Sequence, residues 1–163
     1  GDHVDGREKE WDVANEFTAR CGGVVGTWEP GNSGETVEDI SVLQATRTSQ
    51  NTAFADMASQ LDLCDIRDTA VDFGVHRADG EELSFVPSSI LGVNEVAPLT
   101  MASAFAAIAN EGTYCSPVAI DSVTKRRTGE QLEVPQSRCS QSVTPDIAAA
   151  LAYAMERVVT GGT

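Results

Sequence analysis

The sequence predicts an α+β fold that is mainly helical and carries one β-hairpin. Five stretches have helical character, at residues 41–47, 51–63, 65–73, 98–111 and 145–160. In the longer ones, apolar residues recur three and four positions apart, as on one face of a helix. Between residues 118 and 134 the pattern changes to alternation around a glycine-containing turn, which is typical of two paired strands.

We expect one domain, or part of one, because 163 residues with 41% hydrophobic content can enclose a single core. The predicted boundaries over residues 1–163 are a polar loop region at 1–40, a helical part at 41–112, a hairpin at 113–140 and a helix at 144–160. The loop region has at most a short helix, and Trp11, Val13 and Phe17 are its anchors to the core.

Residue types at the ends of these stretches favour helix boundaries. Pro98 and Pro145 suit the first position of a helix, and Gly74 and Gly112 suit the turn after its end. Asp65 is expected near the start of the second long helix, and a short strand is expected at 88–91 within an otherwise irregular segment. The residues expected on buried helix faces are Phe54, Met57, Ala58, Leu61, Ile66, Ala70, Phe73, Met101, Phe105, Ile108, Ile147, Leu151, Ala154, Met155 and Val158.

The chain is strongly acidic, with a formal net charge of -14 from 25 acidic and 11 basic residues. Such a charge argues against nucleic acid as a partner and against contact of this segment with an anionic membrane. We interpret the acidity as a solvated surface. The sequence has no apolar run long enough to span a membrane and no signal peptide.

Four cysteines, Cys21, Cys64, Cys115 and Cys139, occur without the C-x-x-C spacing of a zinc site. Disulfides are the favoured interpretation and free buried thiols the alternative, with the pairing left open. Cys115 and Cys139 bracket the predicted hairpin. Disulfides imply an oxidising compartment, so an exported chain without a signal peptide is expected to be an excerpt of a longer one. No metal is expected, and the isolated His3 and His76 are expected at the surface.

The stretch 47–54 places a serine hydroxyl, Ser49, and a carboxamide, Asn51, two residues apart before an amphipathic helix. Alternate residues of an extended turn point to one side, so both side chains are expected to face a common cleft. The alternative is that Ser49 only caps a helix, because S-x-N by itself is a weak motif.

A longer ordered pattern surrounds this motif. It consists of Trp28-x-Pro30-x-Asn32, Ile40-x-Val42-Leu43-Gln44-Ala45-Thr46-x-x-Ser49-x-Asn51, Leu91-Gly92-x-x-Glu95-Val96-Ala97-Pro98-Leu99-x-x-Ala102-x-Ala104-Phe105 and Ala109-Asn110-x-Gly112-Thr113-Tyr114. The pattern resembles the transpeptidase domain of class A penicillin-binding proteins, with cysteines like those of the actinobacterial branch. The resemblance implies a fragment of the penicillin-binding and β-lactamase-like fold, mainly its helical subdomain plus a hairpin.

The resemblance also implies a function. Such domains are serine D,D-transpeptidases that cross-link peptidoglycan and are acylated by β-lactams, using S-x-x-K, S-x-N and K-T-G motifs. Ser49 and Asn51 match the second motif, which implies catalytic and substrate-binding roles for both. The expected partners are a stem peptide, β-lactams and the remainder of the domain, with no cofactor. The expected location is extracytoplasmic or secreted, with the parent anchored by an upstream segment.

The other two motifs are expected outside this chain, before residue 1 and after residue 163, so the fragment is expected to be inactive alone and to expose helix faces meant for a sheet. Ser122-Val123-Thr124-Lys125 and Arg127-Thr128-Gly129 resemble them only in letters, because they fall on a predicted hairpin. A secreted non-catalytic binding module with the same fold is the alternative function. A β-lactamase is less favoured, because no general base for deacylation is evident.

Overall fold

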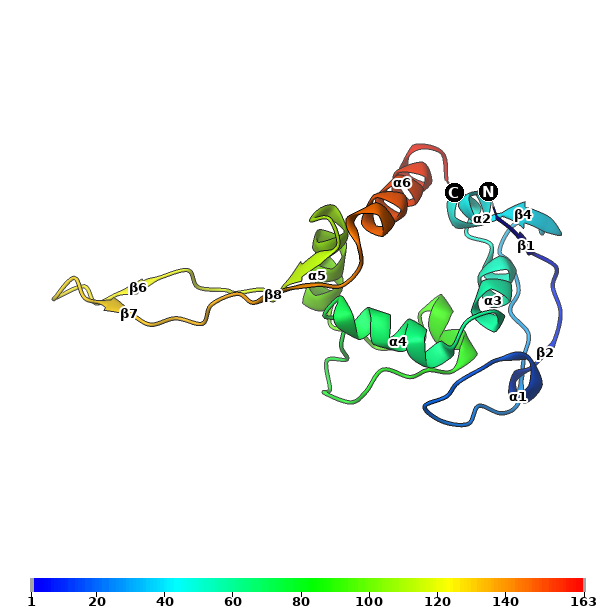
Figure 1. Ribbon diagram of the computed structural model, residues 1–163, viewed down its shortest axis with the longest axis horizontal. Coiled ribbons are helices and arrows are strands. Elements are labelled where there is room, and N and C mark those ends of the chain that lie inside the picture. The colour runs from blue at the N-terminus through cyan, green and yellow to red at the C-terminus, as the bar shows by residue number, and fades with distance from the viewer. Residues whose placement is uncertain (1, 163) are drawn as a thin grey trace.

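The computed structural model describes residues 2–162, so the two end positions of the predicted range lie outside it. Figure 1 shows that the helices from α2 (Val42–Thr48) to α6 (Pro145–Gly161) follow one another around a ring, and the first and last described residues lie near α2. A long two-stranded segment, residues 113–141, projects from beside α5 on the side opposite α2, and we call it the arm. The architecture is therefore an α+β body with one hairpin, as the sequence predicts.

Helices α2 and α4 each begin after a residue whose side chain caps the first turn, Ser41 and Asp62 respectively. Asp62 accepts a hydrogen bond from the Cys64 N–H and so caps α4, and Asp65 lies in the first turn of this helix, as predicted. Gly74, with φ of +77°, turns the chain after α4. The helices are α1 (Val13–Glu16), α2 (Val42–Thr48), α3 (Asn51–Ser59), α4 (Leu63–Asp72), α5 (Pro98–Ala109), α6 (Pro145–Gly161) and the 3-10 helix η1 (Pro87–Leu91).

All strands of the described residues are short and pair two by two in antiparallel fashion. The pairs are β1 (His3–Asp5) with β4 (Asp39–Ser41), β2 (Trp11–Asp12) with β3 (Thr27–Trp28), β5 (Thr113–Cys115) with β8 (Cys139–Gln141), and β6 (Val123–Thr124) with β7 (Gln131–Leu132). The strands within the first 40 residues were not predicted, because two or three residues are too few to show alternation.

The predicted hairpin is present, but its strands are shorter than the alternation indicates. Cys115 lies directly opposite Cys139 at its root, and β6 and β7 pair near its tip. The strand predicted at 88–91 is wrong, because η1 occupies this segment. Pro87 favours the first turn of a helix, since its fixed φ suits that position.

Within residues 2–162, apolar side chains form three small buried clusters instead of one large core. Trp11, Val13 and Phe17 are buried against α3 and the start of α4, which confirms these three anchors. A second cluster joins the end of α4 to α5 and contains Phe73, Val75, Leu83, Ala104 and Ala107. The third lies between β4, α2 and α3 and contains Ile40, Ala45 and Ala53.

Several residues predicted on buried helix faces are exposed instead. Leu61 is 55% exposed and Phe105 is 51% exposed, whereas the alanines Ala104, Ala107 and Ala148 are buried. Small residues allow close helix packing, so alanine faces meet inside the body and larger apolar faces point outward. Met101, Ile147, Leu151 and Val158 are also exposed, in agreement with the expected uncovered helix faces.

Among residues 2–162, no helix has both the length and the apolar character needed to cross a membrane.

Candidate functional site

The Ser49–Asn51 motif lies at a sharp junction between α2 and α3. Ser49 follows the last residue of α2 in the left-handed conformation, with φ of 54° and ψ of 49°. Gln50 is extended, and Asn51 is the first residue of α3. The predicted extended turn is therefore wrong. The chain reverses because the Gln50 N–H returns to the carbonyl of Ala45 at 3.0 Å, a closure typical of helix C-termini.

The Ser49 side chain is exposed. No hydrogen bond to its hydroxyl occurs among residues 2–162, and α3 receives no side-chain cap from its own N-cap residue, Gln50. The capping role considered for the Ser49 hydroxyl is thus not seen. A left-handed conformation costs a residue with a β carbon about 1–2 kcal/mol. Strain of this kind persists where the surrounding structure enforces it, and it is common at functional sites.

The Asn51 carboxamide is half-buried and held in one orientation. Its Nδ2 donates a hydrogen bond to the carbonyl oxygen of Gly31 at 2.8 Å. Its Oδ1 has no hydrogen-bond donor within the described part of the chain. The Ser49 hydroxyl and Asn51 Oδ1 can each accept a hydrogen bond from an ammonium or an amide N–H.

Between these two residues, Gln50 points inward and is 4% exposed. Its Nε2 donates to the carbonyl of Glu35 at 2.7 Å, and its Oε1 accepts from the N–H of Val37 at 3.4 Å. A buried amide with both ends satisfied stabilises the junction, whereas an unpaired one would cost about 1–3 kcal/mol. Gln50 therefore ties the junction to the segment that precedes β4.

Thr52 is also buried, at 1% exposure, and links three segments. Its hydroxyl donates to the carbonyl of Gly6 at 2.5 Å and accepts from Asn32 Nδ2 at 2.9 Å. Sequence reasoning missed Gln50 and Thr52 as supports of the site. The available signal was their polarity at the start of a helix whose other inward positions are alanine.

The end of α6 secures the other side of the junction. The Arg47 Nε, in the last turn of α2, donates to the carbonyl of Gly161. A groove of about 520 Å³ lies between α2 and α6. Its lining residues are Asp2, Ser41, Val42, Leu43, Thr46, Ala150, Tyr153 and Ala154. Thr46 lies one helical turn before Ser49, although Ser49 and Asn51 do not line this groove themselves.

A pocket beside α3 is lined by His3, Val4, Asp5, Arg7, Glu38, Asp39 and Asp56. The backbone N–H of Asp5 donates to Asp56 Oδ2 at 3.1 Å, and His3 Nδ1 lies 2.8 Å from Asp39 Oδ1. The Arg7 guanidinium, hydrogen-bonded to Asp5, lowers the pKa of that carboxyl below its ordinary value. Within residues 2–162, no group of three or more His, Cys, Asp or Glu side chains is placed to hold a metal ion.

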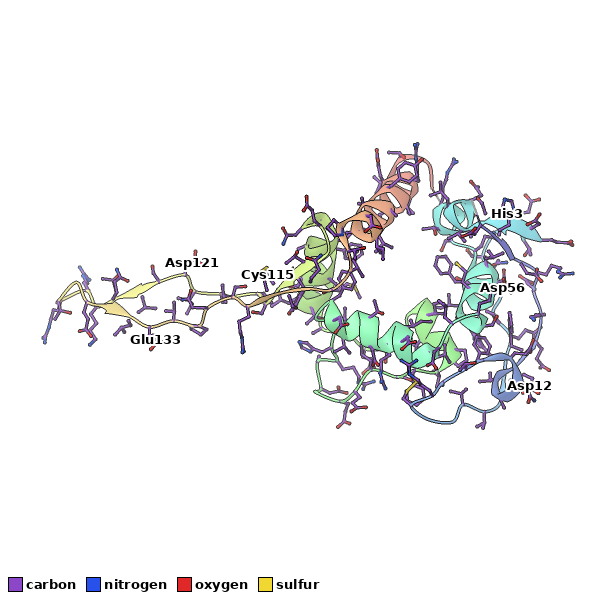
Figure 2. All side chains as sticks on the ribbon, viewed as in Figure 1. His3, Asp12, Asp56, Cys115, Asp121 and Glu133 are labelled. Carbon is purple, nitrogen blue, oxygen red and sulfur yellow. A yellow bond between two sulfur atoms is a disulfide. The ribbon has the colours of Figure 1, made fainter. Side chains whose placement is uncertain are left out.

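The two look-alike motifs lie far from Ser49. Ser122-x-x-Lys125 runs along β6, and Arg127-Thr128-Gly129 forms the turn at the tip of the arm, where Gly129 has φ of 73°. Lys125 Nζ pairs with Glu130 at 2.8 Å. Figures 1 and 2 show this tip at the opposite end of the molecule from α2 and α3. Neither motif therefore contributes to a site at Ser49.

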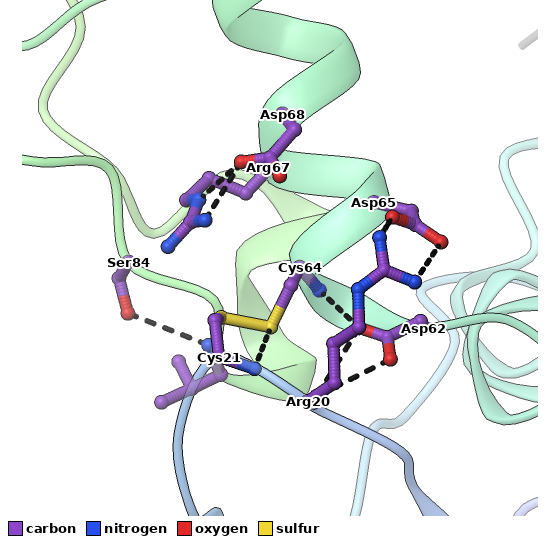
Figure 3. The surroundings of a disulfide bond; sticks show 9 residues. Arg20, Cys21, Asp62, Cys64, Asp65, Arg67, Asp68 and Ser84 are labelled. Carbon is purple, nitrogen blue, oxygen red and sulfur yellow. Dashed lines mark hydrogen bonds and ion pairs between the residues drawn. A yellow bond between two sulfur atoms is a disulfide. The ribbon is translucent and has the colours of Figure 1, made fainter.

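Two disulfides connect distant parts of the chain: Cys21 to Cys64 and Cys115 to Cys139. Cys64 is buried in the first turn of α4, and Figure 3 shows its disulfide with Cys21. Next to it, the Arg20 guanidinium pairs with Asp65, and the Arg20 backbone N–H donates to Asp62. This disulfide joins the N-terminal segment to the helices that follow the Ser49–Asn51 junction.

One comparison with known proteins shows the family of the chain, and another shows similar folds. Residues 9–163 match the family described as "Penicillin binding protein transpeptidase domain". The structure is similar to PonA1 from Mycobacterium tuberculosis, with a TM-score of 0.74 at 21% identity over 98% of this chain and 41% of that one. It is also similar to PBPA of M. tuberculosis, with a TM-score of 0.66 at 20% identity over 93% of this chain and 39% of that one.

PBPA in an imipenem acyl-enzyme complex gives a TM-score of 0.68 at 18% identity, over 99% of this chain and 39% of that one. At these identities the likeness shows a common fold. The chain spans about two fifths of the length of the solved structures it matches. No curated protein matches the sequence.

Proposed function

This chain belongs to the penicillin-binding protein transpeptidase domain family, and from this premise we propose that it forms part of a serine D,D-transpeptidase. The proposed enzyme cross-links peptidoglycan stem peptides by acyl transfer and is acylated by β-lactams. The observation that carries the proposal is the exposed Ser49 hydroxyl, free of hydrogen bonds among residues 2–162 and held two residues from Asn51 at a strained junction.

In this proposal Ser49 and Asn51 form one wall of the acylation site. Acyl transfer at a serine requires removal of a proton during attack and return of a proton to the departing amine. The Ser49 hydroxyl both accepts and donates hydrogen bonds, so it can relay that proton. Asn51 Oδ1 accepts a hydrogen bond from the catalytic ammonium or from the substrate amide. Neither role requires a cofactor.

We further propose that the nucleophilic serine, its lysine and the K-T-G strand are supplied by polypeptide outside these 163 residues. The two lysines of the chain support this, because both are paired. Lys9 Nζ contacts Glu16 at 3.0 Å and lies 3.4 Å above the Trp11 ring, and Lys125 pairs with Glu130. Neither lysine stands beside a serine on a helix, the arrangement that S-x-x-K chemistry needs.

A labelling experiment with fluorescent penicillin tests the proposal. The transpeptidase that contains residues 1–163 is expected to be labelled covalently with a stoichiometry of one, and the isolated chain is expected to remain unlabelled. Labelling of the isolated chain would show that it carries its own nucleophile. Absence of labelling in both would favour a non-catalytic binding module with the same fold.

The parent is proposed to be a class A, actinobacterial-type enzyme on the extracytoplasmic face of the membrane, anchored by an upstream segment. Two disulfides support this location, because disulfides persist in oxidising compartments. The order of the quoted sequence pattern supports the class. Alkylation of free thiols in whole cells, before any lysis, tests the location. Alkylated cysteines in the mature protein would show reduced thiols and would contradict it.

A further inference from the structure

A short strap, defined here as residues 30–32, crosses the N-terminus of α3. Pro30 is buried, and the strap runs beside the junction that carries Ser49 and Asn51. Two of its groups contact α3: the Gly31 carbonyl accepts from Asn51, and the Asn32 side chain contacts Thr52. The strap therefore touches two consecutive residues of the first turn of α3.

Asn32 takes the place of the missing helix cap. Its Oδ1 accepts from the Thr52 backbone N–H at 3.3 Å, and its Nδ2 donates to the Thr52 hydroxyl at 2.9 Å. The N-cap residue itself, Gln50, makes no side-chain hydrogen bond to α3. The first N–H groups of a helix need acceptors, and a side chain that supplies one contributes about 1 kcal/mol. Asn32, 20 positions before Thr52 in the sequence, thus supplies an acceptor for a backbone N–H in the first turn of α3.

The strap also makes hydrogen bonds to Glu8 and Thr36. The Asn32 backbone N–H donates to Glu8 Oε1 at 3.1 Å, and Asn32 Nδ2 also lies 3.1 Å from the Thr36 hydroxyl. The Thr36 hydroxyl in turn donates to Glu8 Oε1 at 3.3 Å. The Asn32 side chain therefore has little freedom to turn, and neither does the Gly31 carbonyl that precedes it.

The Gly31 carbonyl decides which atom Asn51 presents. Nδ2 of Asn51 points at that carbonyl, so a flipped amide would bring two oxygens together and lose the hydrogen bond. Oδ1 consequently faces away from the strap as an acceptor. The side chain that the proposed chemistry needs is thus oriented by a backbone group, which Asn32 keeps in place.

We infer that Asn32 is a positioning residue for the proposed acyl transfer, acting through the Gly31 carbonyl on Asn51 and through Thr52 on the start of α3. The inference rests on the proposed function, and Asn32 itself does not touch the reacting atoms. Loss of its side chain allows the strap to move away from α3. A displacement of about 1 Å at a reacting group can lower a rate about 100-fold.

The test measures acylation by a chromogenic cephalosporin in the transpeptidase that contains this chain. Asn32→Ala is expected to lower the acylation rate constant about 10- to 100-fold, with the preceding noncovalent dissociation constant changed less than about threefold. Thr52→Val removes the hydroxyl that Asn32 contacts and is expected to act in the same direction. Thr52→Ser keeps the hydroxyl and is expected to restore most of the rate.

Asn94→Ala is the matched control. Asn94 also connects loop backbone, since its Oδ1 accepts from the Ser84 N–H at 2.8 Å and its Nδ2 donates to the Ser84 carbonyl at 3.3 Å. It is expected to acylate at the wild-type rate.

The outcomes separate the two levels of the proposal. If Asn32→Ala and Thr52→Val are acylated at the rate of Asn94→Ala, the positioning role of Asn32 is overturned. Labelling of the wild type would still support the proposed transpeptidase function. A wild type that is never acylated would overturn both. If Asn32→Ala does not fold, the comparison of Thr52→Val with Thr52→Ser decides.

Discussion

The ring of Tyr114 occupies the space where a side chain at Gly74 would stand. A β carbon on Gly74 would lie 2.2 Å from Tyr114 Cζ and 2.5 Å from its hydroxyl oxygen. Gly74 ends α4, and Tyr114 is the middle residue of β5 at the root of the arm. The close approach joins the helical body to the hairpin, and it requires glycine both for space and for φ of +77°.

Gly74→Ala is therefore expected to destabilise the fold by about 3 kcal/mol, from backbone strain together with overpacking against Tyr114. Gly80→Ala is the matched control, because Gly80 has φ of +82° and no neighbour within 4 Å of an added β carbon. It is expected to cost about 1 kcal/mol from the backbone alone. Urea unfolding of both variants measures the difference, and equal losses would show that the Tyr114 contact has no cost.

Ser49→Gly separates stability from chemistry at the junction. Glycine adopts the left-handed conformation without penalty, so this variant is expected to be as stable as the wild type or about 1 kcal/mol more stable. Its rate of acylation by penicillin in the full transpeptidase is expected to fall at least about 100-fold, because the relay hydroxyl is lost. Thermal unfolding and acylation kinetics together check the two halves of this prediction.

Glu111→Gly is the control for that experiment. Glu111 is the other residue with a β carbon and positive φ among residues 2–162, also at 54°. Its replacement relieves the same strain and leaves Ser49 untouched, so stability is expected to rise while the acylation rate stays constant. A parallel loss of acylation in Glu111→Gly would assign the Ser49→Gly effect to backbone changes.

Protonation of the Asp79 carboxyl is expected to lower the free energy of unfolding in acid. The hydrogen bond from the Arg77 guanidinium lowers the pKa of Asp79 to about 2, from an ordinary value of 3.8. The folded state thus binds the proton less tightly than the unfolded state, and the stabilisation is complete above pH 3.8 and lost as pH falls towards about 2. Unfolding free energies across that range are expected to decline less steeply in Asp79→Asn than in the wild type.

The two disulfides are expected to stabilise different parts of the molecule. Cys21 and Cys64 are 43 residues apart and join the N-terminal segment to α4. Replacing both with alanine is expected to lower the unfolding free energy of the body by about 4 kcal/mol in the chain-entropy model. Chemical denaturation of the oxidised wild type and the double variant measures this loss.

Removal of Cys115 and Cys139 is expected to act on the arm instead. An isolated two-stranded hairpin is marginally stable in water, and this disulfide closes its root. Faster amide hydrogen exchange at β6 and β7 is expected, with the urea midpoint of the body shifted by less than half of the Cys21 and Cys64 effect. A larger shift of the body would show that the arm and body unfold together.

Local signals in the sequence predicted the helices well. Pro98, Pro145 and Gly74 lie at helix ends, and the residues between them repeat at helical spacing. The strand predicted at 88–91 was wrong because a short helix that begins at a proline and a short strand have similar apolar content. The buried faces predicted for α5 and α6 were wrong at Met101, Phe105, Ile147, Leu151 and Val158, because periodicity identifies an apolar face but does not say which face meets a neighbour.

The sequence by itself determined the helical segments, the hairpin and the positions of Ser49 and Asn51, because these depend on residues within one or two turns of each other. Only the tertiary structure decided the orientation of Asn51 and the cap that Asn32 provides. Those features depend on contacts between residues 20 to 46 positions apart, such as Asn32 with Thr52 and Thr52 with Gly6. Contacts of that range arise when separate segments pack together, and no local pattern encodes them.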